Sequence, residues 1–215
     1  MFFSPAGLLL SLALASPIGR GVTRFSAREK VTRLDSYQTK EGEEDIRKAI
    51  ERLVANTSNV LDLGCGTGLS TRVDGLGVDK SKEAIRIARL LHPKKRFVQD
   101  DAATFENGQS TFNAVTLIHV LQECGQEERM RILNNACRLS NHVIVVGPDP
   151  ASRMVMNPFM FSGNEKQLND YYTWIELDLA EIAFVHDRFS STSHVGNTMI
   201  TQLRDKSLLS RNRFA

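Results

Sequence analysis

The sequence predicts an α/β domain built on a mostly parallel seven-stranded sheet, with helices on both faces and a C-terminal antiparallel hairpin. Short apolar runs alternate with amphipathic segments from about residue 43 to residue 146, a pattern typical of parallel strands joined by helices. Two last runs are separated by Gly196-Asn197, a pair that favours a tight turn between antiparallel strands. A chain of 215 residues is long enough to bury one such core.

The first half of the domain is predicted to hold two helices and three strands. Apolar residues at helical spacing predict a helix over Glu43 to Val54. A second helix is expected to begin after Ser81, a good N-cap residue, and to end before Pro93. Short apolar runs predict strands at 60–63, 76–78 and 96–99.

The second half continues the alternation and then changes character. Strands are predicted at 112–118 and 142–146, with a helix over 126–139 between them. A long helix is expected to run through Leu168 and Ile182, followed by strands at 184–190 and 198–203. Between the fifth strand and this helix, residues 150–170 show no period but contain Met154, Phe159 and Phe161. Such a segment either covers an acceptor pocket as a lid or packs on the sheet as a small core.

Residues 1–33 are predicted to be a targeting leader, separate from the domain at 34–215. An apolar run over 8–15 precedes a stretch rich in Arg, Ser and Thr, and the two halves together resemble the bipartite leaders of proteins sent to complex plastids. We expect import into an organelle, with a plastid favoured over a mitochondrion, and a cytoplasmic location if the leader is not used. The apolar stretch is short for a membrane span, so we expect no stable span in the mature form.

Charge and cysteine content exclude several other classes of protein. The leader carries five basic side chains and one acidic one, a net of +4, whereas the whole chain carries +2. Residues 34–215 therefore carry about −2, which argues against a nucleic-acid binder. Three cysteines argue against a disulfide framework, and none has zinc-ligand spacing, so no metal is expected.

The segment Val60-Leu61-Asp62-Leu63-Gly64-Cys65-Gly66-Thr67-Gly68 is the strongest functional signal. A strand must turn sharply here while its backbone approaches a ligand, which glycine permits because it tolerates positive φ and has no Cβ. The segment closely resembles motif I of the class I S-adenosylmethionine (SAM)-dependent methyltransferases, in particular a type-11-like, small-molecule branch. The resemblance implies a Rossmann-like methyltransferase fold with SAM as the cofactor, bound around Asp62, Gly64, Cys65, Gly66 and Gly68.

The same resemblance implies further cofactor-binding positions at the ends of the next strands. Asp79 is expected to accept hydrogen bonds from both ribose hydroxyls, with Lys80 beside it, unless Asp79 only initiates a helix. The helix between Gly68 and Asp79 is expected to be a stub, because only 11 residues separate them. Asp101, rather than Asp100, is expected to bind the adenine amino group, and the backbone of Ala102 the ring.

Two residues after the fourth predicted strand are candidate catalytic groups. His119 could border the sulfonium or act as a general base near neutral pH, or it could be purely structural. Glu123 could act in the same way or could cap the following helix.

The resemblance implies methyl transfer to a small-molecule acceptor, and a lid rich in apolar residues at 150–170 would suit an acceptor that is aromatic, quinone-like or lipid-like. The first alternative is a SAM-binding, methyltransferase-like assembly or regulatory factor without catalytic activity. The second is an aminopropyltransferase, which would need an acidic pocket after the fourth strand.

Overall fold

The structure is a computed structural model, and it describes residues 46–108, 111–152 and 165–207. The leader predicted at residues 1–33 lies outside the described residues, and so does most of the predicted lid, at 153–164. The helices are α3 (Ile46–Leu53), α4 (Lys82–Leu91), α5 (Gln126–Leu139) and α6 (Glu165–Val185), with two single turns, η1 (Leu121–Glu123) and η2 (Pro150–Ser152). The strands are β1 (Val60–Leu63), β2 (Leu76–Asp79), β3 (Arg96–Gln99), β4 (Ala114–Ile118), β5 (His142–Pro148), β6 (Arg188–Val195) and β7 (Thr198–Asp205).

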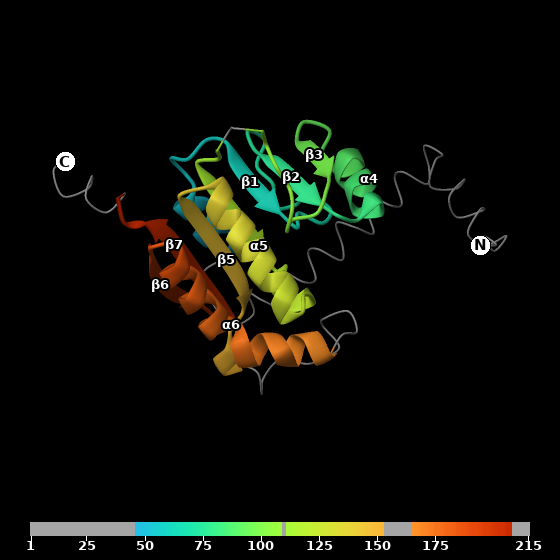
Figure 1. The fold of residues 1–215 in the computed structure, drawn as a ribbon. Helices are drawn as coiled ribbons and strands as arrows, with labels where there is room; N and C mark the ends of the chain where they lie inside the picture. The colour runs from blue at the N-terminus through green and yellow to red at the C-terminus, as the bar shows by residue number, and fades with distance from the viewer. Residues whose placement is uncertain (1–45, 109–110, 153–164, 208–215) are drawn as a thin grey trace.

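The strands form one seven-stranded sheet in the order β3-β2-β1-β4-β5-β7-β6 (Figure 1). The first five pair in parallel, whereas β7 pairs antiparallel with both β5 and β6. The predicted fold class is therefore confirmed. The chain moves outward from β1 to β2 and β3, then returns to β4 on the other side of β1. This reversal places a topological switch point between β1 and β4, where open α/β sheets bind ligands.

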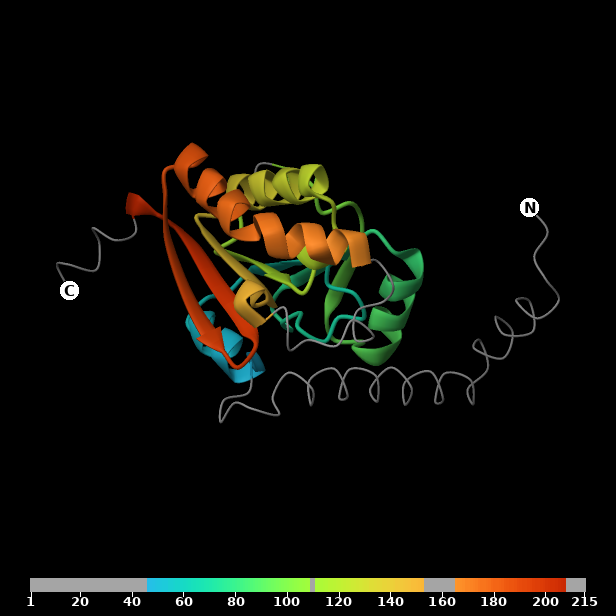
Figure 2. The same cartoon turned by 90° about the horizontal axis from the view of Figure 1, so that it is seen from below.

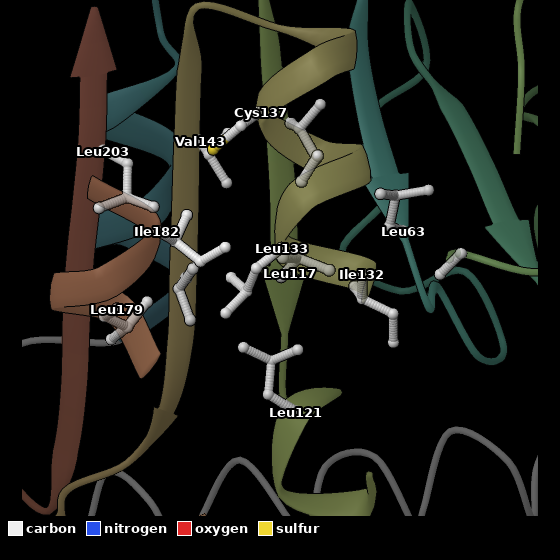
Figure 3. Close-up of a cluster of buried hydrophobic side chains, with 14 of the residues drawn as sticks. Leu63, Leu117, Leu121, Ile132, Leu133, Cys137, Val143, Leu179, Ile182 and Leu203 are labelled. Atoms are coloured by element: carbon white, nitrogen blue, oxygen red, sulfur yellow. The ribbon is translucent and has the colours of Figure 1, made fainter. Parts of the chain in front are cut away.

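Helices cover both faces of the sheet (Figure 2). α5 and α6 pack on one face over the larger hydrophobic core, in which Leu133 and Ile182 meet Leu117 and Val143 of the strands (Figure 3). α3 packs on the opposite face against Val60, Ala114 and Ile144, and α4 covers β3 on that face through a small cluster that includes Ile85 and Phe97. No helix in the described ranges is both long enough and apolar enough to cross a membrane.

Two predicted elements differ from the structure. The strand predicted at 184–190 is present but begins later, because α6 continues to Val185 and the chain reverses at Asp187, whose φ is 49°, before β6 begins at Arg188. Phe184 and Val185 have strand-forming side chains but end the helix on its exposed side. The stub helix expected between Gly68 and Asp79 is also absent, since residues 64–75 form turns and bends only.

A fully buried arginine joins the two helices of the larger core. The Arg129 side chain, on α5, is 0% exposed, and its Nε donates to Asp178 Oδ2 of α6 at 3.0 Å. Its Nη1 donates to Asp170 Oδ2 of α6 and to the Cys124 backbone oxygen, both at 2.8 Å. A charge can be buried this deeply because it is paired and hydrogen-bonded. The network fixes α6 against the start of α5 and against η1.

We predict that Arg129→Met destabilises the protein by roughly 3–5 kcal/mol, because Asp178 is left as an uncompensated buried charge. Urea unfolding followed by circular dichroism measures this loss. Arg86→Met is the matched control, since Arg86 pairs with Glu83 on the surface, and such exposed pairs contribute at most about 1 kcal/mol. Equal losses in the two variants would contradict the structural role of Arg129.

Candidate cofactor site

A cavity of about 460 Å³ lies at the carboxyl ends of the strands, beside the switch point between β1 and β4. Its volume is in the range of small-molecule sites. Four segments supply the lining: the glycine loop after β1, the end of β2, the turn after β3, and the segment from the end of β4 into α5. The lining residues are Gly64, Gly66, Asp79, Lys80, Asp101, Ala102, His119, Val120, Glu123, Cys124, Glu128 and Ile132.

Two other hollows are larger but lie away from the glycine loop's ligand-facing side. One of about 680 Å³ lies on the opposite face of the sheet, between α3 and residues 69–74. Another of about 610 Å³ lies on the outer side of α5, near Arg131 and Arg138. The site is assigned to the smaller cavity, because it alone of these three joins the ends of β2 and β4.

The glycine loop is held to β2 by backbone hydrogen bonds. The amides of Gly64 and Cys65 both donate to the Val78 carbonyl oxygen, at 2.7 and 3.0 Å. The Gly66 amide donates to Asp79 Oδ2 at 2.8 Å, and the Ser81 amide donates to Asp79 Oδ1 at 2.8 Å. The Asp79 carboxylate thus ties the loop to the start of α4 while it lines the cavity.

The three glycines of the loop are required for different reasons, although each has positive φ. A Cβ on Gly64 would lie 2.4 Å from a methyl group of Val120, and one on Gly68 would lie 2.4 Å from the Phe97 ring. A Cβ on Gly66 would meet no protein atom within 4 Å. Because Gly66 lines the cavity, the space beside its Cα is open to a ligand.

Asp62 lies behind the loop rather than in the cavity. Its side chain is 2% exposed and accepts hydrogen bonds from the hydroxyls of Ser70 and Thr71, at 2.8 and 2.7 Å, and of Thr116, at 3.1 Å. Burial raises the pKa of Asp62, whereas these three hydroxyls lower it. Asp62 therefore fixes the path of the loop after Gly68.

Apart from the buried Asp62, ten positions are predicted to bind the cofactor or to act in catalysis. Eight of these ten line this cavity: Gly64, Gly66, Asp79, Lys80, Asp101, Ala102, His119 and Glu123. The other two, Cys65 and Gly68, do not line it. The Cys65 sulfur points instead to the small cluster under α4, close to Gly77, and burial raises the pKa of its thiol above the usual range. The roles predicted for these residues in cofactor binding stay predictions.

The turn after β3 distinguishes two neighbouring acids. Asp101 lines the cavity, whereas Asp100 does not. The Asp101 carboxylate accepts from the Ala103 amide at 2.8 Å, and the Asp100 carboxylate accepts from the Asp101 amide at 2.7 Å. Asp101 is thus held by its own turn on the cavity side.

His119 ends β4 in a left-handed conformation with φ of 53°. Its amide donates to the Val146 oxygen of β5 at 2.8 Å, and the turn brings Val120 against Gly64. Such a conformation costs on the order of 1 kcal/mol outside glycine, and strained residues cluster at functional sites. Burial lowers the pKa of His119 to about 4, so its imidazole is neutral near pH 7 and is a weaker general base than expected.

Glu123 and four residues missed by sequence reasoning complete the cavity wall. Burial raises the pKa of Glu123, which makes its carboxylate a better proton acceptor than an ordinary surface glutamate. The missed residues are Val120, Cys124, Glu128 and Ile132. Cys124, Glu128 and Ile132 recur every four residues, so they could have been found as one face of α5 and the turn before it.

Comparisons with known proteins agree with this geometry. Residues 60–142, from β1 into the start of β5, match the family described as "Methyltransferase domain". No curated protein matches the chain at the sequence level. Many solved structures do match it in fold.

Three similar structures cover most of the chain. The methyltransferase domain of bacterial CtHen1 has a TM-score of 0.60 at 14% identity, over 79% of this chain and 98% of that one. Magnesium protoporphyrin IX methyltransferase from Synechocystis PCC 6803, with bound S-adenosylhomocysteine (SAH), has a TM-score of 0.58 at 14% identity, over 87% and 99%. The plantazolicin methyltransferase BpumL, also with SAH, has a TM-score of 0.55 at 16% identity, over 94% and 92%.

The fold is thus that of the Rossmann-like methyltransferases, and the glycine-loop cavity lies where open α/β sheets bind ligands. More narrowly, the resemblance to the class I SAM-dependent methyltransferases is confirmed, since residues 60–142 match the family described as "Methyltransferase domain".

We predict that Gly66→Ala weakens SAH binding at least about tenfold, because the added methyl group enters the cavity rather than the protein core. Gly108→Ala is the matched control: Gly108 also has positive φ, 58° against 52° for Gly66, and an open Cβ direction, but it does not line the cavity. Both variants should lose similar stability through backbone strain. Titration calorimetry decides the matter, and equal SAH affinities in the two variants would exclude the cavity as the binding site.

A second prediction concerns the pH dependence of stability. An unfolded histidine has a pKa near 6.5 and gains its proton first as the pH falls, so buried His119 makes folding less favourable between about pH 6.5 and pH 4. His119→Asn removes this titration and keeps a residue that tolerates the left-handed conformation. Relative to the variant, the wild type should lose about 2 kcal/mol of unfolding free energy between pH 7.5 and pH 4.5. Denaturant unfolding at both pH values measures it, and parallel pH profiles would contradict the burial of this imidazole.

Proposed function

We propose that the protein is an enzyme that transfers a methyl group from SAM to a small-molecule acceptor. The observation that carries the proposal is the convergence, on one cavity, of the open glycine Gly66, the acid Asp79 and the strained His119. Strained residues of this kind occur at active sites and at ligand clamps, so His119 supports a functional site at the end of β4.

The residues of the cavity fit SAM, and their main contribution is to position the cofactor and the acceptor. Asp79 has lone pairs left to accept hydrogen bonds from two ribose hydroxyls, since each of its two carboxylate oxygens accepts one hydrogen bond from a backbone amide. Asp101 and Ala102 would bind the adenine edge, and His119 and Val120 would lie toward the methionine half. SAM supplies an activated methyl group on a sulfonium, which leaves as a neutral thioether. Alignment of an acceptor with that group can contribute roughly 7–11 kcal/mol.

Proton removal from the acceptor is assigned to Glu123 rather than His119. Both residues line the cavity, but burial lowers the pKa of His119 to about 4 and raises the pKa of Glu123. A base is most effective when its pKa approaches the working pH, which favours the carboxylate. His119 then contributes a neutral, uncharged wall that does not repel the cationic sulfonium.

The acceptor is proposed to be an aromatic or otherwise extended apolar molecule. Two of the similar structures bear the names of methyltransferases for magnesium protoporphyrin IX and for plantazolicin, and the segment 153–164 of this chain contains Met154, Met156, Phe159, Met160 and Phe161. On the described side of that segment, Tyr171 is fully buried and donates its hydroxyl to the Pro148 oxygen at 3.2 Å. Tyr171 therefore belongs to the core, and any lid ends before it.

We predict that the full chain binds SAH and that Asp79→Ala weakens this binding by about 10- to 100-fold, the equivalent of one charge-assisted hydrogen bond of about 1.5–3 kcal/mol. Asp74→Ala is the control, because Asp74 is an exposed acid of the same connection that pairs with Arg72 outside this cavity. Calorimetry gives the affinities, and thermal melting checks that the loop survives the loss of its tie to Asp79.

Catalysis itself is tested by incubating the full chain with methyl-labelled SAM and a metabolite extract. Label should move to an apolar small molecule, and Glu123→Gln should lower the rate without changing SAH affinity. SAH binding with no transfer to any extract would instead favour a SAM-binding assembly or regulatory factor. Failure of the wild type to bind SAH would reject the proposed function.

A further inference from the structure

An ion pair crosses the cavity between two elements that are distant in the sequence. Lys80 follows Asp79 directly at the carboxyl end of β2, and Glu128 lies in the first turn of α5. The Lys80 Nζ lies 2.8 Å from Glu128 Oε1, across a separation of 48 residues. Both residues line the cavity. The pair therefore joins one wall of the cavity to the other.

The neighbours of the pair show which end of the cavity it crosses. The charge of Glu128 raises the pKa of the Cys124 thiol and the charge of Lys80 lowers it. The charge of Asp101 raises the pKa of Lys80. The hydrogen bond to Glu128 raises the pKa of Lys80, so the lysine is charged at neutral pH. Asp79 and Asp101, the residues assigned to ribose and adenine, thus lie on the side of the cavity that the pair bridges.

We propose that Lys80 and Glu128 form a clasp over the adenosine end of the cavity, which opens when the cofactor enters or leaves and closes over it when it is bound. The proposal rests on the proposed function. In the closed state the four methylenes of Lys80 lie over the cavity as an apolar cover, while the ammonium group stays at the surface. Lys80 and Glu128 are positioning residues and take no part in the chemistry.

The exposure of the two side chains suits an opening clasp. The Lys80 side chain is 68% exposed, whereas the Glu128 side chain is only 27% exposed. The lysine can therefore swing away while the glutamate stays fixed on the helix. An exposed ion pair changes an equilibrium constant by only about 1.4- to 5-fold, so the clasp can open at low cost each time the cofactor exchanges.

A charge-swap experiment tests the clasp. The variants Lys80→Glu, Glu128→Lys and the double swap are made in the full chain, and SAH affinity and dissociation rate are measured by calorimetry and stopped flow. Each single variant should weaken SAH binding about three- to tenfold and speed its release, because like charges hold the clasp open. The double swap restores an ion pair and should return the affinity to within about twofold of the wild type.

Glu83 and Arg86 provide the matched control. They form an exposed pair on α4 at 2.7 Å, and neither lines the cavity. Glu83→Arg, Arg86→Glu and their double swap should leave SAH affinity unchanged. Thermal melting of all variants separates an effect on folding from an effect on binding. If the Lys80–Glu128 pair were merely structural, the variants would change the melting temperature, and the double swap would not restore the affinity for SAH.

A second ligand locates the effect. Methylthioadenosine, which has the adenosine half of SAH without the amino acid, should lose affinity by the same factors as SAH. Loss for SAH alone would overturn the clasp as a cover of the adenosine end. Wild-type binding of SAH with unaffected single variants, or with a double swap that is not rescued, would overturn the clasp but keep the proposed function. Absence of SAH binding in the wild type would reject both.

Discussion

The rest of the structure depends on how β1 is connected to β2 without a helix. Only residues 64–75 lie between the two strands, close to the shortest crossover that parallel strands allow, and such crossovers usually contain a helix. Two carboxylates hold this connection in place where a helix would usually do so. Asp62 accepts hydrogen bonds from the hydroxyls of Ser70, Thr71 and Thr116, and Asp79 accepts hydrogen bonds from the amides of Gly66 and Ser81. These hydrogen bonds therefore hold the glycine loop in a connection that contains no helix of its own.

The opposite wall of the cavity is held by a different network. Arg129 joins α5 to α6 and also binds the Cys124 oxygen, so the segment that carries Glu123 and Cys124 is fixed from behind by a buried charge. The cavity thus lies between a loop anchored by acids and a helix anchored by an arginine, and each anchor belongs to a separate part of the chain. A cavity built in this way can keep its shape while a flexible surface lysine moves across it.

Local signals in the sequence predicted most of the fold, and long-range polar contacts account for what they missed. The strands at 60–63 and 96–99 and the helix at 126–139 have the predicted bounds. These bounds depend on apolar periodicity and on capping residues, which are both local in the sequence. The strand predicted at 184–190 begins only at Arg188, since Phe184 and Val185 favour a strand locally but belong to the end of the preceding helix. The glycine loop, Asp79 and Asp101 could be found from their spacing. The partners Glu128 and Asp178 could not, because each contacts a residue about 50 positions away.

The chemistry that the cavity can support follows from its charges. A sulfonium donor reacts when its methyl group faces a nucleophile in line, so the site has to exclude water and hold two molecules rather than generate a strong base. A protonated histidine beside a sulfonium would oppose binding of the donor, whereas burial keeps His119 neutral through the physiological range. Burial makes His119 a weaker base because it lowers the pKa of the imidazole, and it makes Glu123 a stronger base because it raises the pKa of the carboxyl group. Desolvation at the end of β4 therefore shifts the pKa values of two groups in opposite directions, because it lowers the pKa of the imidazole and raises the pKa of the carboxyl group.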